Sequence, residues 1–133
     1  MTSPQKRRRL AVLNDSAPTL STIGKWFEIH GYGVVTAQVG MMRIAHIDVE
    51  AFVAKHRPDV IVFDVAMPYE SNWDFLEVLR MLPGLQGIPI VVTTANKKAL
   101  ESLVGRTTAM QIIGKPKDLS ELQHLVDTAT VKH

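Results

Sequence analysis

Four polar side chains follow apolar stretches of the sequence at positions where they could carry out phosphoryl chemistry. Asp15 and Asp64 supply carboxylates, Thr94 a hydroxyl and Lys115 an ammonium group. Carboxylate oxygens suit Mg²⁺, and a carboxylate can act as a nucleophile, while hydroxyl and ammonium groups bind phosphoryl oxygens. Each residue alone has an ordinary explanation in a turn or at a strand end. Brought together, they would form a phosphoryl-transfer site.

The elements that must position these residues alternate along the chain. Short aliphatic runs predict strands at residues 10–13, 34–37, 60–63, 88–93 and 110–113. Helical spacing predicts helices over residues 20–27, 41–56, 72–81, 97–104 and 119–128. Continuous aliphatic strands are covered on both faces. The sequence therefore predicts an α/β fold, a five-stranded parallel sheet with helices on both faces, flavodoxin-like and doubly wound.

In such a sheet, functional residues gather beyond the carboxyl ends of the strands. Asp15 follows the first predicted strand, Asp64 the third, Thr94 the fourth and Lys115 the fifth. If the first and third strands are neighbours, the two carboxylates lie at the same edge of the sheet. The topology thus predicts one site from residues far apart in sequence.

Composition limits the other function classes. The 133 residues include no cysteine, which excludes disulfides, thiolate metal sites and cysteine nucleophiles. No apolar stretch approaches the ~18 residues of a membrane helix, so we expect no membrane association. The net charge of +2 comes from residues 1–9, because residues 10–133 carry a net charge of −2. We expect residues 1–8 to be a basic disordered tail, 9–129 one domain and 130–133 a C-terminal tail.

The blocks at the predicted strand ends resemble a known family, the receiver domain of two-component response regulators. They are Asn14-Asp15, residues 64–68 (DVAMP), Thr94-Ala95 and Lys115-Pro116. The spacing between the blocks makes the resemblance specific, and it runs from about residue 9 to residue 128. It implies the receiver fold and a bacterial, cytoplasmic phosphoprotein.

The resemblance also implies roles for these residues. Asp64 would be the phosphoacceptor, with Thr94 and Lys115 holding the phosphoryl group. Mg²⁺ would be the cofactor. Its ligands would be Asp15, Asp64, the backbone carbonyl of Ala66 and, through water, Asn14. The family's Lys-Pro bond is commonly cis, so we expect the same of Lys115-Pro116.

The sequence departs from the family at several positions. Asn14 replaces an acid, which predicts weaker Mg²⁺ binding. Asn72 replaces a common glycine, and Asn tolerates the left-handed conformation that Gly would supply. Ile112 replaces an aromatic residue, so we expect that switching does not depend on an aromatic ring at this position. Residues 40–58 form a longer segment than usual.

The leading interpretation is a stand-alone receiver. A histidine kinase or a histidine phosphotransfer protein would donate the phosphoryl group, and the domain would assist its own Mg²⁺-dependent phosphorylation and dephosphorylation without being a conventional enzyme. Only 18 residues follow Lys115, so we expect no output domain and no nucleic-acid binding in this chain. The signal would pass to a partner protein, from a monomer or a phosphorylation-dependent dimer.

Three alternatives share features with this interpretation. A pseudo-receiver would bind a partner without phosphorylation, which Asn14 and Ile112 favour and the four polar residues at the strand ends oppose. A flavodoxin-like cofactor binder is disfavoured because Asp15 would repel the flavin phosphate. An aspartyl phosphatase usually needs a second acid two residues after the nucleophile, where this chain has Ala17.

Overall fold

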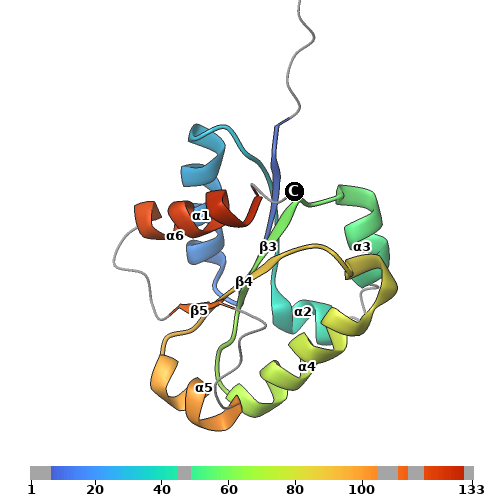
Figure 1. Cartoon of the computed structure of the whole chain (residues 1–133), viewed down its shortest axis with the longest axis vertical. Coiled ribbons are helices and arrows are strands. Elements are labelled where there is room, and N and C mark those ends of the chain that lie inside the picture. Colours follow the sequence, from blue (N-terminus) through green and yellow to red (C-terminus); the bar gives the residue numbers. More distant parts are fainter. Residues whose placement is uncertain (1–6, 45–48, 105–110, 114–118, 131–133) are drawn as a thin grey trace, which may run out of the picture.

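The computed structural model describes residues 7–44, 49–104, 111–113 and 119–130. The strands are β1 (Arg9–Leu13), β2 (Gly33–Ala37), β3 (Val60–Asp64), β4 (Ile90–Thr93) and β5 (Gln111–Ile113). The helices are α1 (Ala17–Ile29), α2 (Val39–Ile44), α3 (Val49–His56), α4 (Tyr69–Met81), α5 (Lys97–Val104) and α6 (Leu119–Thr130), with a 3₁₀ turn η1 (Pro83–Leu85). Strands and helices alternate along the chain (Figure 1).

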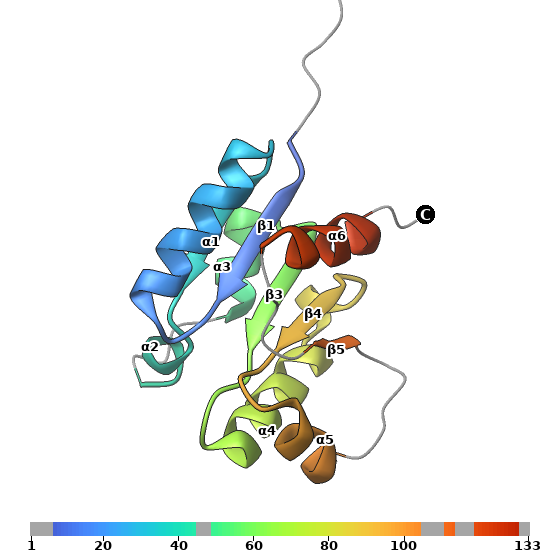
Figure 2. The ribbon, with the colours of Figure 1, turned by 90° about the vertical axis from the view of Figure 1, so that its left-hand side faces the viewer.

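The five strands form one parallel sheet in the order β2-β1-β3-β4-β5. This confirms the predicted fold class, including the adjacency of the first and third strands. All five strands finish at the same edge, so the loops that follow β1, β3 and β4 lie next to one another (Figure 2). Strand β2 lies on one side of β1, and the later strands β3, β4 and β5 lie on the other side. The switch point of the strand order is therefore between β1 and β3, where ligand sites of such sheets form.

Two hydrophobic cores cover the two faces of the sheet. Alternate residues of β1 and β3 point to opposite faces, so Ala11 and Phe63 belong to one core, and Leu10 and Val62 to the other. The first core is filled by α2, α3, α4 and α5, and the second by α1 and α6. Burial on both faces explains why these strands are continuous aliphatic runs.

Helix α1 follows directly from its sequence. The Ser16 side chain accepts a hydrogen bond from the backbone N–H of Thr19 at 3.3 Å, which caps the helix. Leu20, Ile23 and Phe27 are buried at helical spacing, as predicted. After the helix, Gly31 adopts φ +95°, a conformation that favours glycine, and the chain turns into β2.

The prediction of one helix over residues 41–56 is wrong. The structure has two helices there, α2 and α3, and Asp48, a candidate cap, lies outside the described residues. The buried residues are Val39 and Met42 of α2, and Val49 and Val53 of α3. Their spacing is also what one continuous helix would show, so periodicity could not disclose the interruption.

None of the helices in the described ranges has the length and apolar character needed to cross a membrane.

At the amino-terminal edge of the sheet, a hydrogen bond joins α6 to the residue that precedes β2. The hydroxyl of Tyr32, a residue 3% exposed, donates to the carboxylate of Asp127 on α6. Burial and this carboxylate raise the pKa of Tyr32, so the hydroxyl remains a donor across the neutral range. The ring of Tyr32 also packs edge-on against Phe27 of α1, with centroids 5.2 Å apart.

We expect Tyr32→Phe to lower the free energy of unfolding by about 1–2 kcal/mol, because it removes a hydrogen bond to a charged acceptor while keeping the ring. Urea unfolding followed by circular dichroism measures this change. A variant as stable as the unaltered protein would show that the Tyr32–Asp127 bond contributes nothing net.

Candidate functional site

The predicted residues that the structure describes meet at the carboxyl edge of the sheet. Asn14 and Asp15 follow β1, Asp64 is the last residue of β3, and Thr94 follows β4. Since β1 and β3 are paired neighbours, the two carboxylates come from adjacent strands, as predicted. Lys115 and Pro116 lie outside the described residues, as does the predicted cis bond between them. Within the described ranges, Met67-Pro68 is a cis proline bond.

Asp64 is partly buried and is held by a residue that sequence analysis missed. The Thr93 hydroxyl donates a hydrogen bond of 2.7 Å to Oδ1 of Asp64. Burial raises the pKa of Asp64, the Thr93 hydrogen bond opposes this rise, and the negative charge of Asp15 adds to it. The register pairs Asp64 with Thr93 across β3 and β4, and only knowledge of that register could have identified the contact.

Hydrogen bonds within the loop after β1, and from it to the end of β2 and to α2, fix this loop. The Asn14 side-chain oxygen accepts from the backbone N–H of Ser16 at 2.8 Å, an Asx turn that leads into α1. The backbone N–H of Asn14 donates to the carbonyl of Ala37 at the end of β2. Asp15 is exposed, and its Oδ1 accepts from the backbone N–H of Gly40 at 2.6 Å. Neutral donors therefore hold both side chains.

Asn72 has a different role from the one predicted. It lies within α4, and Arg57 is the non-glycine residue for which the described chain shows a positive φ, so the left-handed interpretation of Asn72 is wrong. Its side chain is buried, 4% exposed, and its amide donates to the carbonyl oxygen of Ala66 at 2.7 Å. Asn72 therefore fixes the carbonyl that was predicted to bind Mg²⁺.

Thr94 is almost fully buried, 1% exposed, and its hydroxyl donates to the carbonyl of Val65 at 2.9 Å. Of the two adjacent threonines, the one whose hydroxyl contacts the Asp64 carboxylate in this structure is Thr93. Ile112 belongs to β5, and its side chain lies outside the described set.

The oxygen atoms at this edge fit a hard divalent cation. Asp15 raises the pKa of Asp64, and neither carboxylate forms an ion pair with a cationic side chain of the described residues. Within those residues, no three His, Asp or Glu side chains gather closely enough to hold a metal by themselves. Mg²⁺ keeps several waters and needs only one or two carboxylates, so two carboxylates and the Ala66 carbonyl suit it.

An open cavity of about 490 Å³ extends from this edge. Its lining includes Asp64 and Thr94 together with residues of α1 and the beginning of α6. The apolar contributions from these helices include Pro18, Ile23 and Leu119. A partner group that bound in this cavity could contact both Asp64 and these apolar side chains.

Comparison with known proteins gives concordant results. The family model for the response regulator receiver domain matches residues 10–127. The response regulator MprA of Mycobacterium tuberculosis (strain H37Rv) is 34% identical over 118 residues, covering 86% of this chain and 46% of MprA. MprA of Mycobacterium avium (strain 104) is 33% identical over 118 residues, covering 86% of this chain and 47% of that protein. The chain thus spans just under half the length of these curated relatives.

Solved structures agree with the fold. The chemotaxis protein CheY4 of Vibrio cholerae superposes with a TM-score of 0.70 at 25% identity, covering 93% of this chain and 99% of the other. A response regulator from Burkholderia multivorans gives a TM-score of 0.55 at 28% identity, with 92% and 94% covered.

We expect Asp64→Asn to raise the free energy of unfolding at pH 7 in metal-free buffer, because burial and the charge of Asp15 penalise the ionised carboxylate. The folded protein binds this proton more tightly than the unfolded chain. The advantage of the Asn variant should therefore be complete above the folded-state pKa and should disappear as the pH falls below the usual value of 3.8.

Thermal or urea unfolding between pH 3.5 and 7 with a chelator present measures this difference. The matched control is Asp74→Asn on the exposed side of α4, which should change stability by less than about 0.5 kcal/mol. An equal effect of both substitutions at every pH would contradict the prediction.

Proposed function

The chain belongs to the receiver domain family of two-component response regulators, and from this we propose that Asp64 is its phosphoacceptor. Receivers of this family are regulatory phosphoacceptor domains. The observation that supports this assignment is the position of Asp64. It is the last residue of β3, beside β1, and the negative charge of Asp15 raises the pKa of its carboxylate. We propose residues 9–129 as the receiver itself.

The transfer forms one bond and breaks another. A carboxylate oxygen of ionised Asp64 attacks phosphorus, so that an acyl phosphate forms while the bond from phosphorus to the donor histidine nitrogen breaks. The leaving nitrogen keeps the electron pair and takes up a proton. Thr93 holds Oδ1 of Asp64 by its hydrogen bond, which restricts the carboxylate to one orientation.

Asp15, Asp64 and the Ala66 carbonyl would hold Mg²⁺, and Asn14 would reach it through water. When bound, the cation neutralises charge that develops on the phosphoryl oxygens. Asn72 keeps the Ala66 carbonyl in position through its buried amide. Since Asn14 adds no charge, we infer that binding is weaker than with an acid at this position.

Thr94 and Lys115 are proposed to hold the transferred phosphoryl group. For this, the Thr94 hydroxyl must give up its bond to the Val65 carbonyl and turn toward Asp64. Because Thr94 lies between β4 and the loop leading to α5, such a change would also move the backbone of that loop, as in other two-state switches.

The proposed donor is a phosphohistidine of a histidine kinase or a histidine phosphotransfer protein. The cavity beside Asp64 supports this, because its walls of α1 and α6 offer apolar contacts through Ile23 and Leu119 to a helix that carries a histidine. Signalling through a downstream protein, in the cytoplasm, is part of the same proposal.

Incubation with a small acyl phosphate and Mg²⁺, followed by intact-mass measurement, tests the assignment. We expect one phosphoryl group, labile in acid and in base, on the unaltered protein and none on Asp64→Asn, because the amide is no nucleophile. Asp74→Asn, which removes an exposed carboxylate from α4, should still be labelled. Absence of label on the unaltered chain would favour the pseudo-receiver, and label on Asp64→Asn would place the acceptor elsewhere.

We expect Asn14→Asp to tighten Mg²⁺ binding severalfold, because an added carboxylate strengthens the attraction for a hard cation. The new side chain can still accept the hydrogen bond from Ser16. Calorimetric titration with MgCl₂ measures the affinity.

The control for Asn14→Asp is Gln86→Glu, which adds the same charge at an exposed position before β4, at the other end of the sheet. Equal affinities for Asn14→Asp and the unaltered protein would show that position 14 does not act on the metal.

A further inference from the structure

The loops after β1 and β2 are joined by three hydrogen bonds. The backbone N–H of Asn14 donates to the Ala37 carbonyl at 3.1 Å, and the Gln38 side-chain amide donates to the Asp15 carbonyl at 3.3 Å. The third is the shortest, from the Gly40 backbone N–H to Oδ1 of Asp15 at 2.6 Å. This last bond is charge-assisted, which makes it stronger than a bond between neutral groups.

Gly40 can approach Asp15 so closely because it lacks a side chain. A Cβ atom at position 40 would lie 3.2 Å from Oδ1 of Asp15 and 3.9 Å from its Cγ. The first distance is tighter than ordinary van der Waals contact, so the carboxylate would have to move by a few tenths of an ångström. A side chain at position 40 would therefore displace the Asp15 carboxylate from its present position.

Helix α2 is itself firmly attached to the protein core. Val39 and Met42, on either side of Gly40, are each 2% exposed and belong to the core that α3, α4 and α5 also fill. The N–H of Met42 donates to the carbonyl of Gln38 at 3.1 Å, which fixes the beginning of the helix. The Gly40 N–H is thus a donor at a fixed position, and Asp15 is attached to it.

We propose that Gly40 is a positioning residue for the metal site, and that it couples Asp15 to helix α2. Its N–H engages Oδ1 of Asp15, and among the described residues Oδ2 has no hydrogen-bond donor, which leaves that oxygen for a cation. This inference rests on the proposed role of Asp15 as a Mg²⁺ ligand. Groups that orient a metal ligand commonly change metal affinity when they are altered.

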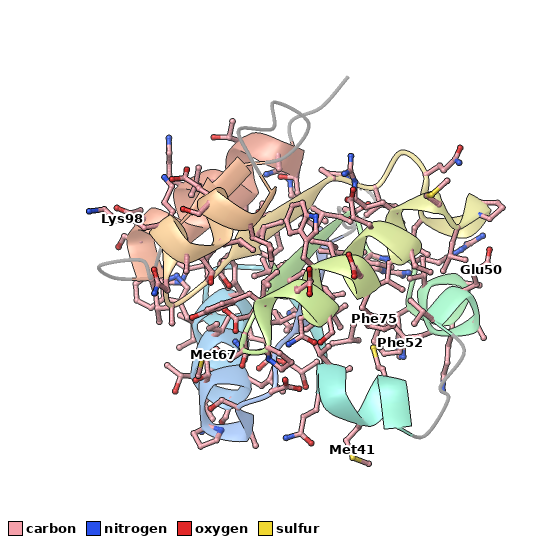
Figure 3. All side chains as sticks on the ribbon, turned by 90° about the horizontal axis from the view of Figure 1, so that it is seen from below. Met41, Glu50, Phe52, Met67, Phe75 and Lys98 are labelled. Carbon is pink, nitrogen blue, oxygen red and sulfur yellow. The ribbon has the colours of Figure 1, made fainter. Side chains whose placement is uncertain are left out.

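The coupling gives α2 a role that the family resemblance did not predict. If the cation and the position of α2 influence each other through Asp15, then any contact that displaces α2 must change Mg²⁺ affinity, and by the same factor Mg²⁺ must change that contact. Met41, next to Gly40, is 51% exposed and points away from the rest of the protein on the outer side of α2 (Figure 3). Helix α2 can therefore report occupancy of the site independently of Thr94.

The test compares Gly40→Ala with Gly33→Ala in the full chain. A Cβ at Gly33 meets no atom within 4 Å, so this variant controls for the general effect of replacing glycine by alanine. We expect the Kd for Mg²⁺, from calorimetric titration with MgCl₂, to rise by about threefold to tenfold in Gly40→Ala. In Gly33→Ala it should remain within about 1.5-fold of the unaltered protein.

A second measurement uses the unaltered chain and does not depend on a variant that folds. In ¹H–¹⁵N spectra, the amide signals of Gly40 and Met42 should shift during the MgCl₂ titration and saturate with the calorimetric Kd, while the amide signal of Gly33 stays in place. Such shifts would show that the cation acts on α2 through the bond to Asp15.

The outcomes separate this inference from the proposed function. Labelling of Asp64 and Mg²⁺ binding by the unaltered chain, with equal affinities in the two alanine variants and no shift at Gly40, would overturn the role of Gly40 alone. Absence of Mg²⁺ binding by the unaltered chain would overturn both proposals. If Gly40→Ala does not fold, the spectra of the unaltered chain decide.

Discussion

The pairing of β1 with β3 places two carboxylates, Asp15 and Asp64, at one edge of the sheet, and the rest of the site depends on this unfavourable proximity. The pairing itself is fixed by the hydrophobic cores, because a shift of register by one residue would send every aliphatic side chain of β1 to the wrong face. The cost of bringing like charges together is therefore met by burial elsewhere. A cation bound between the carboxylates would relieve the repulsion.

In the described part of this edge, oxygen atoms accept hydrogen bonds from neutral donors and form no ion pairs with cationic side chains. A threonine hydroxyl holds Asp64, a backbone N–H holds Asp15, and an asparagine amide holds the Ala66 carbonyl. Each fixes an oxygen atom in position without neutralising its charge. The raised pKa of Asp64 follows from this arrangement, since burial and Asp15 outweigh the Thr93 hydrogen bond. Among the described residues, these oxygen atoms are thus held in place without ion pairs, an arrangement that suits a hard cation.

The sequence predicted the fold, and which residues lie at the carboxyl edge of the sheet, better than it predicted the contacts of those residues. Aliphatic runs revealed the strands because both faces of the sheet are buried, and the topology then placed Asp15 near Asp64. The contacts of Thr93 and Gly40 depend on register and on loop paths between distant segments, which local patterns do not encode. Asn72 was misassigned because its residue type suits a turn, whereas the structure uses its amide inside α4. The buried residues of α2 and α3 keep helical spacing, so the sequence pattern did not distinguish two helices from one.

Two contacts could transmit a change at the site to other parts of the domain, one through Thr94 and one through Gly40. They differ in the hydrogen bonds that must change. Thr94 is buried and bonded to the Val65 carbonyl, so using it requires the exchange of one hydrogen bond for another and a movement of its loop. Gly40 is already bonded to Asp15, so a cation can act on α2 without breaking any bond. Under the proposed function, the first change would respond to a phosphoryl group on Asp64, whereas the second would respond to Mg²⁺ bound at Asp15. A receiver with both can distinguish a site that is ready from one that is phosphorylated, because the two states bias different helices.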